Sequence, residues 1–102
     1  MDFEYNSSKS EANRAKHGIS FEEAKEMWAV VGVVGFGRIS HELRFIRVCC
    51  WQGKFYSCVF TVRKEVIRII SVRRSWGKEE KIYQENRQHE KKSEKDFGEG
   101  IR

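Results

Sequence analysis

The sequence predicts a small α+β domain with two N-terminal helices, a curved four-stranded antiparallel sheet and a C-terminal helix. Residues 8–29 carry apolar side chains at helical spacing, whereas residues 30–73 are rich in β-branched side chains divided by turn residues. A chain of 102 residues can form one hydrophobic core and is too short for two. We therefore expect one domain over residues 1–86, followed by a charged, flexible tail over residues 87–102.

Two short helices are expected before the sheet. The first spans residues 8–17, because a capping-box pattern starts at Ser8 and Gly18 suits a left-handed helix end. The second spans residues 21–29 and follows a capping-box pattern that starts at Ser20. Its apolar face, which we expect to pack on the core, contains Phe21, Ala24, Met27 and Trp28.

The sheet is expected to begin near Val30 with a bent or bulged strand, because three glycines interrupt this apolar segment. Three clearer strands follow and form an antiparallel meander with tight turns between them. These strands span residues 44–51, 55–62 and 66–73. Ser75 can then cap a third helix that ends near Asn86 and directs Ile82 toward the sheet.

The basic residues are concentrated in the middle of the chain. Residues 44–83 contain 10 Lys and Arg against 3 Asp and Glu, a net charge of +7, whereas the whole chain has +5. Such a segment is typical of a surface that binds a polyanion, and the alternative is a basic face that is only solvated.

The remaining composition favours a cytoplasmic protein. Cys49, Cys50 and Cys58 have no metal-binding spacing and are expected to be small buried thiols, so we expect no metal and no cofactor. The N-terminus lacks the order of a signal peptide. The longest apolar run, residues 28–36, is too short to cross a membrane.

The last strand carries arginines among its isoleucines and valines. Strict alternation would place Arg68 with Val66, Ile70 and Val72 on one face, and Arg73 with Ile67, Ile69 and Ser71 on the other. An arginine on a partly covered sheet face suits a phosphate ester, because its planar fork gives two parallel hydrogen bonds. If Arg68 and Arg73 serve one phosphate, the strand must twist or bulge between them.

Such cations are compatible with RNA cleavage by the adjacent 2′-hydroxyl. Arginine can offset the charge that grows on the phosphorus oxygens, but it transfers protons poorly. The candidates for proton transfer are the lysines together with His17, His41 and Tyr83.

Each candidate also has a structural alternative. His17 can serve as a helix end, His41 as a surface side chain and Tyr83 as part of the core. Arg44 and Arg47 can be solvated strand residues. Trp51 and Trp76 are expected to be packing anchors rather than platforms for base stacking.

Four segments in this order resemble the BrnT family of type II toxins. They are AKHGISFEEA (residues 15–24), RFIRV (44–48), VFTVR (59–63) and RIISVRR (68–74), the last followed by a helix with Glu80 and Tyr83. The resemblance covers about residues 2–86. The family usually has a polar loop before the Arg44 strand, whereas this chain has the apolar residues 30–40.

The resemblance implies a RelE-like fold and a metal-independent endoribonuclease that degrades RNA and halts growth. It also implies a BrnA-like antitoxin with a ribbon-helix-helix part, which represses its own operon together with the toxin. Carried over by position, the catalytic residues are Arg63, Arg68, Ser71, Arg73, Tyr83 and His17. The RNA-binding residues are Lys16, Arg44, Thr61 and Arg74.

Two other functions fit the same sequence. One is a non-catalytic module, such as an inactivated toxin, that binds RNA or an antitoxin. The other is a subunit that contributes to repression of DNA only through its partner. A steep salt dependence of RNA binding without cleavage would favour the first of these.

Overall fold

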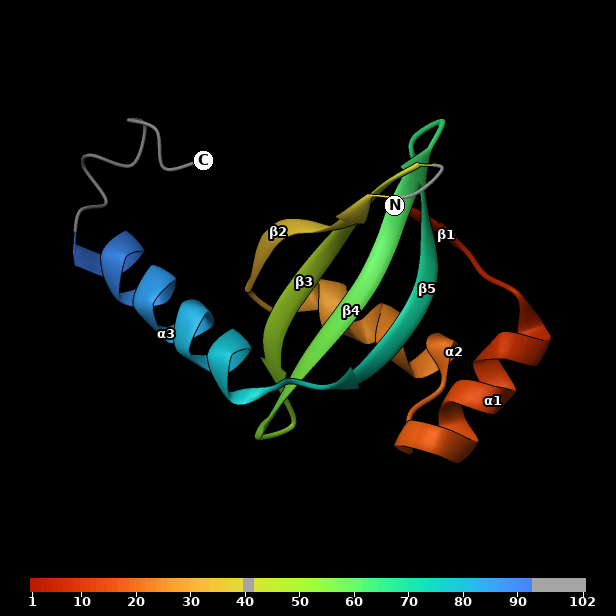
Figure 1. The fold of residues 1–102 in the computed structure, drawn as a ribbon, viewed down its shortest axis with the longest axis horizontal. Helices are drawn as coiled ribbons and strands as arrows, with labels where there is room; N and C mark the ends of the chain where they lie inside the picture. Colours follow the sequence, from red (N-terminus) through yellow and green to blue (C-terminus); the bar gives the residue numbers. More distant parts are fainter. Residues whose placement is uncertain (40–41, 93–102) are drawn as a thin grey trace.

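The computed structural model describes residues 1–39 and 42–92 and confirms the α+β class. Its sheet has the strand order β1-β5-β4-β3-β2. The four longer strands are antiparallel neighbours (Figure 1): β2 (Gly32–Ile39), β3 (Leu43–Trp51), β4 (Lys54–Arg63) and β5 (Val66–Arg74). The expected bend in the first of them is present, because the β2 register shifts between Phe36 and Ile39.

The prediction of four antiparallel strands is wrong, because the sheet has a fifth strand that is parallel to its neighbour. This strand, β1 (Asp2–Glu4), pairs with the start of β5, with Phe3 opposite Ile67. Three residues are too few to show a sequence period, so β1 depends on its tertiary contacts. The Phe3 ring lies edge-on to Trp28 with 5.2 Å between the ring centroids.

Helix α1 (Ser7–His17) begins one residue earlier than expected and has a different cap. The side chain of Asn6 accepts a hydrogen bond from the Lys9 backbone N–H at 3.0 Å, so the predicted capping box at Ser8 is wrong. Asn6 is extended, with φ −86° and ψ 123°, as an N-cap requires. Gly18 ends the helix as predicted, with φ 80° and its N–H bonded to the Arg14 carbonyl.

The second predicted helix consists of two parts. One α-helical turn, α2 (Phe21–Ala24), continues into a 3₁₀ helix, η1 (Lys25–Ala29). The capping box between Ser20 and Glu23 is confirmed, because each side chain bonds the other residue's backbone N–H. The expected face of this segment packs inward, and Phe21, Ala24 and Met27 are buried.

The core lies between these N-terminal helices and one face of the sheet (Figure 1). Buried Asn13 on α1 connects the two layers, since its amide nitrogen donates to the Ile19 carbonyl at 2.8 Å and to the Val72 carbonyl at 2.9 Å. Its side-chain oxygen accepts the Val72 N–H at 3.3 Å. The three cysteines are free thiols, and Cys49 and Cys58 are buried.

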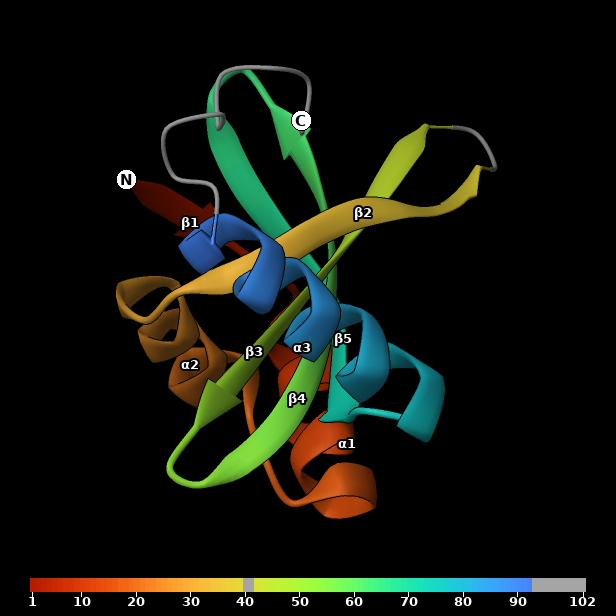
Figure 2. The same ribbon diagram turned by 90° about the vertical axis from the view of Figure 1, so that its left-hand side faces the viewer.

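The other face of the sheet is only partly covered. Helix α3 (Gly77–Lys92) contacts β2 and β3 on this side and continues beyond the predicted end at Asn86 (Figure 2). Residues 93–102 of the expected tail lie outside the described part of the chain. No helix within the described ranges is long and apolar enough to span a membrane.

We predict that Asn13→Ala lowers the free energy of unfolding by about 2 kcal/mol, because the mutation leaves buried backbone groups of Val72 and Ile19 without partners. Urea denaturation measures this change. Gln84→Ala, at an exposed position of α3, is the control and should stay within about 0.5 kcal/mol of the wild type. Equal losses for the two variants would contradict the role of Asn13.

Candidate functional site

A β-bulge in β5 determines which side chains meet on the open face. On β4, the consecutive residues Val59 and Phe60 pair with Ser71 and Ile69, so Ile70 is an extra residue in β5. The strict alternation predicted for this strand is therefore wrong beyond Ile69. We expected a twist or bulge between Arg68 and Arg73 if both bind one ligand, and a bulge is present there.

The register shows that the bulge brings three predicted residues to one face. On β4, Ser57, Val59 and Thr61 alternate and so share a face, and their partners on β5 are Arg73, Ser71 and Arg68. The other face of β5 contributes the buried side chains Ile67, Ile69 and Val72 to the core. Arg68, Ser71 and Arg73 therefore lie on the face opposite the N-terminal helices.

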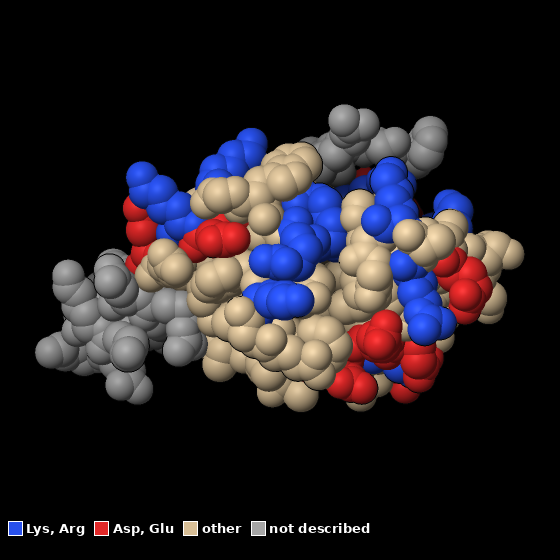
Figure 3. All heavy atoms as spheres, turned by 90° about the horizontal axis from the view of Figure 1, so that it is seen from below, with Lys and Arg blue, Asp and Glu red and all other residues tan. Residues whose placement is uncertain are grey.

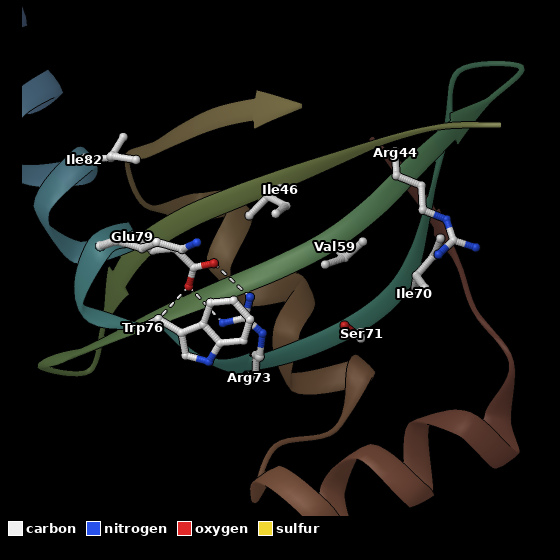
Figure 4. A pocket seen from close by; sticks show the side chains of 10 residues that line it. Arg44, Ile46, Val59, Ile70, Ser71, Arg73, Trp76, Glu79 and Ile82 are labelled. Atoms are coloured by element: carbon white, nitrogen blue, oxygen red, sulfur yellow. Dashed lines mark hydrogen bonds and ion pairs between the residues drawn. The ribbon is translucent and has the colours of Figure 1, made fainter. Parts of the chain in front are cut away.

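A cavity of about 570 Å³ opens on this face beside the start of α3 (Figure 4). Its floor is apolar, whereas its rim contains two arginines, a lysine and a carboxylate. The lining residues from the sheet are Arg44, Ile46, Val59, Ile70, Ser71 and Arg73. Those from the β5–α3 connection and α3 are Trp76, Lys78, Glu79 and Ile82.

Arg73 is fixed at the cavity by Glu79 and Trp76. The two terminal nitrogens of its guanidinium each donate to one oxygen of the Glu79 carboxylate at 2.8 Å. The guanidinium carbon lies 3.8 Å from the centroid of the Trp76 ring. Figure 4 shows the indole lying against this ion pair at the mouth of the cavity.

Glu79 is a buried carboxylate that receives hydrogen bonds from three elements. Besides Arg73, the Ser57 hydroxyl on β4 and the Trp76 backbone N–H at the start of α3 both donate to it at 2.8 Å. The Arg73 bonds, with those from Trp76 and Ser57, lower the pKa of Glu79 from 4.5 to about 2, although burial opposes this shift. Ser75, the predicted cap, instead shares a 2.7 Å hydrogen bond with Ser57.

Arg44 supplies a second cation to the cavity. The residue is half-buried on β3, and Figure 4 shows its side chain extending over the sheet toward Ile70. Its Nε is buried and has no hydrogen-bond partner among the described residues. Arg44 lines the cavity, and a guanidinium there offers N–H donors that suit a ligand with acceptor oxygens.

Other predicted residues of the sheet lie outside the cavity lining. Arg63, at the far end of β4, pairs with Glu42 at 3.0 Å, and Arg68 pairs with Glu4 at 3.3 Å. Thr61 is buried and donates to the Leu43 carbonyl at 2.8 Å. The structure thus places Thr61 where it stabilises the pairing of strands, away from solvent.

Arg74 and Tyr83 have aromatic neighbours. The Arg74 guanidinium carbon lies 5.9 Å from the centroid of the Tyr56 ring. The Tyr83 ring on α3 lies edge-on to Phe55, with 5.3 Å between centroids. Neither Arg74 nor Tyr83 lines the cavity.

The α1 candidates are on the other side of the sheet. Lys16 and His17 lie in the last turn of α1, which packs against α2 and β5 and does not contribute to the cavity. His41 lies outside the described residues. Arg47 also faces the N-terminal helices, where it donates to the Met27 carbonyl at 2.7 Å and the Val30 carbonyl at 2.6 Å.

Sequence reasoning missed Trp76 and Glu79 as parts of the site, and it included Lys78 only among the lysines in general. Trp76 and Glu79 have the spacing of a helix N-cap and the third residue of the helix, and this spacing is visible in the sequence. Ser75 is a more usual N-cap residue, so the sequence favours it instead. The Arg73 and Ser57 contacts of Glu79 depend on the sheet register and have no local signal.

One face of the molecule shows Lys and Arg side chains gathered along its middle, with carboxylates mainly toward its sides (Figure 3). Within the described ranges, no group of three or more His, Cys, Asp or Glu side chains could hold a metal ion. The fold and the cavity together define a small α+β protein with a partly enclosed cationic site, which suits a phosphate-bearing ligand.

Comparison with protein families agrees with this class. Residues 5–79 match the family described as the ribonuclease toxin, BrnT, of type II toxin-antitoxin systems. The matched segment is most of the chain and includes every cavity residue except Ile82, and the chain belongs to this family. A search of curated proteins found no match.

The Glu79 ion pair should make stability depend on pH. Because the folded-state pKa of about 2 is below the unfolded value of 4.5, the stabilisation is present above about pH 4.5 and is lost as the pH falls toward 2. The free energy of unfolding of the wild type should therefore decrease between about pH 6 and pH 3. The decrease should be smaller by roughly 2 kcal/mol in Glu79→Gln, which has no carboxylate to titrate at this position.

Urea denaturation at several pH values measures this difference. Glu85→Gln, at an exposed position of the same helix, should retain the wild-type pH dependence. The same pH dependence for the wild type and Glu79→Gln would exclude the ion pair as a source of stability.

Proposed function

We propose that this chain is the toxin of a type II toxin-antitoxin system and a metal-independent endoribonuclease with a RelE-like fold. The observation that carries this proposal is the cavity, which combines Arg44, Arg73 and Lys78 with Ser71 on a half-covered sheet face. Family membership supports the ribonuclease class and an antitoxin partner. RNA is the proposed substrate, and the cytoplasm is the proposed place of action.

The proposed reaction is attack of the adjacent 2′-hydroxyl on the scissile phosphorus, which forms a 2′,3′-cyclic phosphate as the bond to the 5′-oxygen breaks. The 2′-hydroxyl gives its proton to solvent water, and the leaving 5′-oxygen takes up a proton from the protein. The place of Arg44 in the cavity lining supports a role in binding a phosphate oxygen, and Ser71 offers a hydroxyl on the same face. Arg73, whose charge is offset by Glu79, keeps N–H donors for a phosphate oxygen while it stays bound to Glu79. Fixed donors aimed at the charge that develops on the phosphate favour the transition state over the substrate.

Lys78 is the proposed proton donor to the leaving 5′-oxygen. Of the residues considered for proton transfer, it is the one that lines the cavity, as far as the described residues show. His17 lies on the side of the N-terminal helices, and Tyr83 packs on Phe55. A lysine ammonium carries three N–H donors and can both bind the phosphate and give up a proton.

We expect Arg44→Ala to lower the rate of RNA cleavage by about 10²–10³, because one preorganised cation is lost from the phosphate site. The assay uses purified, antitoxin-free protein and labelled RNA in buffer with EDTA. Arg14→Ala, at an exposed position of α1, removes an arginine of equal charge and should leave the rate unchanged.

Each outcome of this assay bears on one part of the proposal. Cleavage that EDTA abolishes would contradict the metal-independent mechanism. Full activity of Arg44→Ala would contradict the assignment of the site. RNA binding without cleavage by the wild type would identify a non-catalytic module instead.

The proposed antitoxin is BrnA-like, with a ribbon-helix-helix part that brings the complex to operator DNA. The edge strand β2 supports a protein partner, because Val34 is 51% exposed and Phe36 is 75% exposed. Exposed apolar side chains beside an unpaired strand edge are typical of a surface that another chain covers.

We expect Phe36→Asp to weaken neutralisation by the cognate antitoxin at least tenfold without loss of RNA cleavage, because the charge would be buried in the proposed contact. Antitoxin titration of the cleavage reaction measures this effect. Val62→Asp, at an exposed apolar position on β4, two strands from β2, is the control. Unchanged neutralisation of Phe36→Asp would exclude β2 from the contact.

A further inference from the structure

Trp76 is a large aromatic residue that the core does not use. Its side chain is 56% exposed at the mouth of the cavity, although an indole gains most of its stabilisation by burial. The sequence favoured a packing anchor, and this expectation is wrong for Trp76. Trp51 does pack on a neighbour, because its ring centroid lies 5.7 Å from that of Tyr56.

The indole is nevertheless held in a fixed position. Its ring lies on the Arg73 guanidinium at 3.8 Å, and that guanidinium is fixed by both oxygens of Glu79. The Trp76 backbone N–H donates to the same carboxylate at 2.8 Å. Glu79 therefore holds the Trp76 backbone directly and the ring through Arg73. A preorganised aromatic surface loses little conformational entropy when a ligand stacks on it.

We propose that Trp76 is the stacking platform for a nucleobase of single-stranded RNA beside the phosphate held in the cavity. The inference rests on the proposed ribonuclease function and adds a base-binding subsite to it. Figure 4 shows the indole at the edge of the cavity on the side of α3, with Arg44 at the opposite end. A nucleotide between them would place its base on Trp76 and its phosphate toward the cations.

The rest of the cavity fits this ligand. The Lys78 amine lies 5.6 Å from the centroid of the Trp76 ring, close enough for a phosphate next to a stacked base. Ile46, Val59 and Ile70 give the floor an apolar surface for the sugar and the edge of the base. Proteins that bind single-stranded nucleic acid combine basic grooves with exposed aromatic rings in this way.

Stacking differs from base-edge hydrogen bonding in what it selects. Every nucleobase has a π face, so a subsite that depends on Trp76 tolerates different bases at this position. It distinguishes a nucleotide with a base from an abasic one. This difference separates the role of the indole from that of the phosphate-binding cations.

The test measures equilibrium binding of two uncleavable probes to the purified protein. One probe is a 2′-O-methyl oligonucleotide, and the other has the same length and phosphates but abasic residues. Trp76→Ala should weaken binding of the first probe by at least about fivefold and leave the second within about twofold. Trp76→Phe keeps an aromatic ring and should bind the first probe more tightly than Trp76→Ala does.

Trp51→Phe is the matched control and should bind both probes as the wild type does. Equal loss of both probes in Trp76→Ala would show that the indole acts only by supporting Arg73 and would overturn the subsite. Undetectable binding of the first probe to the wild type, or wild-type binding by Trp76→Ala, would also overturn it.

Cleavage of labelled RNA is measured separately, so the two proposals fail in different ways. Trp76-dependent binding by a wild type that cuts no RNA supports the subsite and overturns the ribonuclease function. Cleavage of RNA together with wild-type binding by Trp76→Ala overturns the subsite alone.

Discussion

The architecture of the open sheet face depends on one buried carboxylate, that of Glu79. It accepts hydrogen bonds from Ser57 on β4, from Arg73 on β5 and from the backbone at the start of α3. A buried charge is tolerated only when it is paired and its lone pairs are used, and this carboxylate meets both conditions. The attachment of the start of α3 to the sheet, the position of Arg73 and the backbone of Trp76 therefore all involve this one carboxylate.

The ion pair with Glu79 determines how many N–H donors of Arg73 are available to a ligand. A guanidinium has five N–H donors. Within the described chain, Arg73 uses two of them for Glu79 and one for the Arg74 carbonyl. Two donors remain for a phosphate oxygen without loss of the ion pair. Because Glu79 offsets the charge of Arg73, the uncompensated positive charge in the cavity comes mainly from Arg44 and Lys78.

Much of the fold could be predicted from local patterns. The meander follows from alternation and from turns such as Gln52–Gly53, where φ is 53° and 79°. The Gly18 and Ser20 signals mark a helix end and a helix start correctly. Strand β1 could not be predicted, because three residues carry no period and they pair with residues 66–68, which are far away in the sequence.

The site was predictable only in part, for a related reason. Strict alternation puts Arg68 and Arg73 on opposite faces of β5, so a shared ligand requires a bulge between them. Only the pairing of Val59 and Phe60 with β5 shows that Ile70 is the extra residue. Arg47 is a basic residue whose position on the core side could not be predicted. Its guanidinium lies so close to Gly32 that a Cβ at this position would come within 2.6 Å of it, and neither local sequence indicates this contact.

These contacts change the meaning of the basic central segment. Arg47 binds backbone carbonyls behind the sheet, while Arg63 and Arg68 are paired with Glu42 and Glu4. Net charge therefore overstates the surface available to RNA. A few cations beside an apolar floor act more strongly than the same charges in open water, because a partly enclosed site has a lower effective dielectric constant. The chemistry we propose thus depends on the placement of Arg44 and Lys78 around the Glu79 network more than on the number of basic residues.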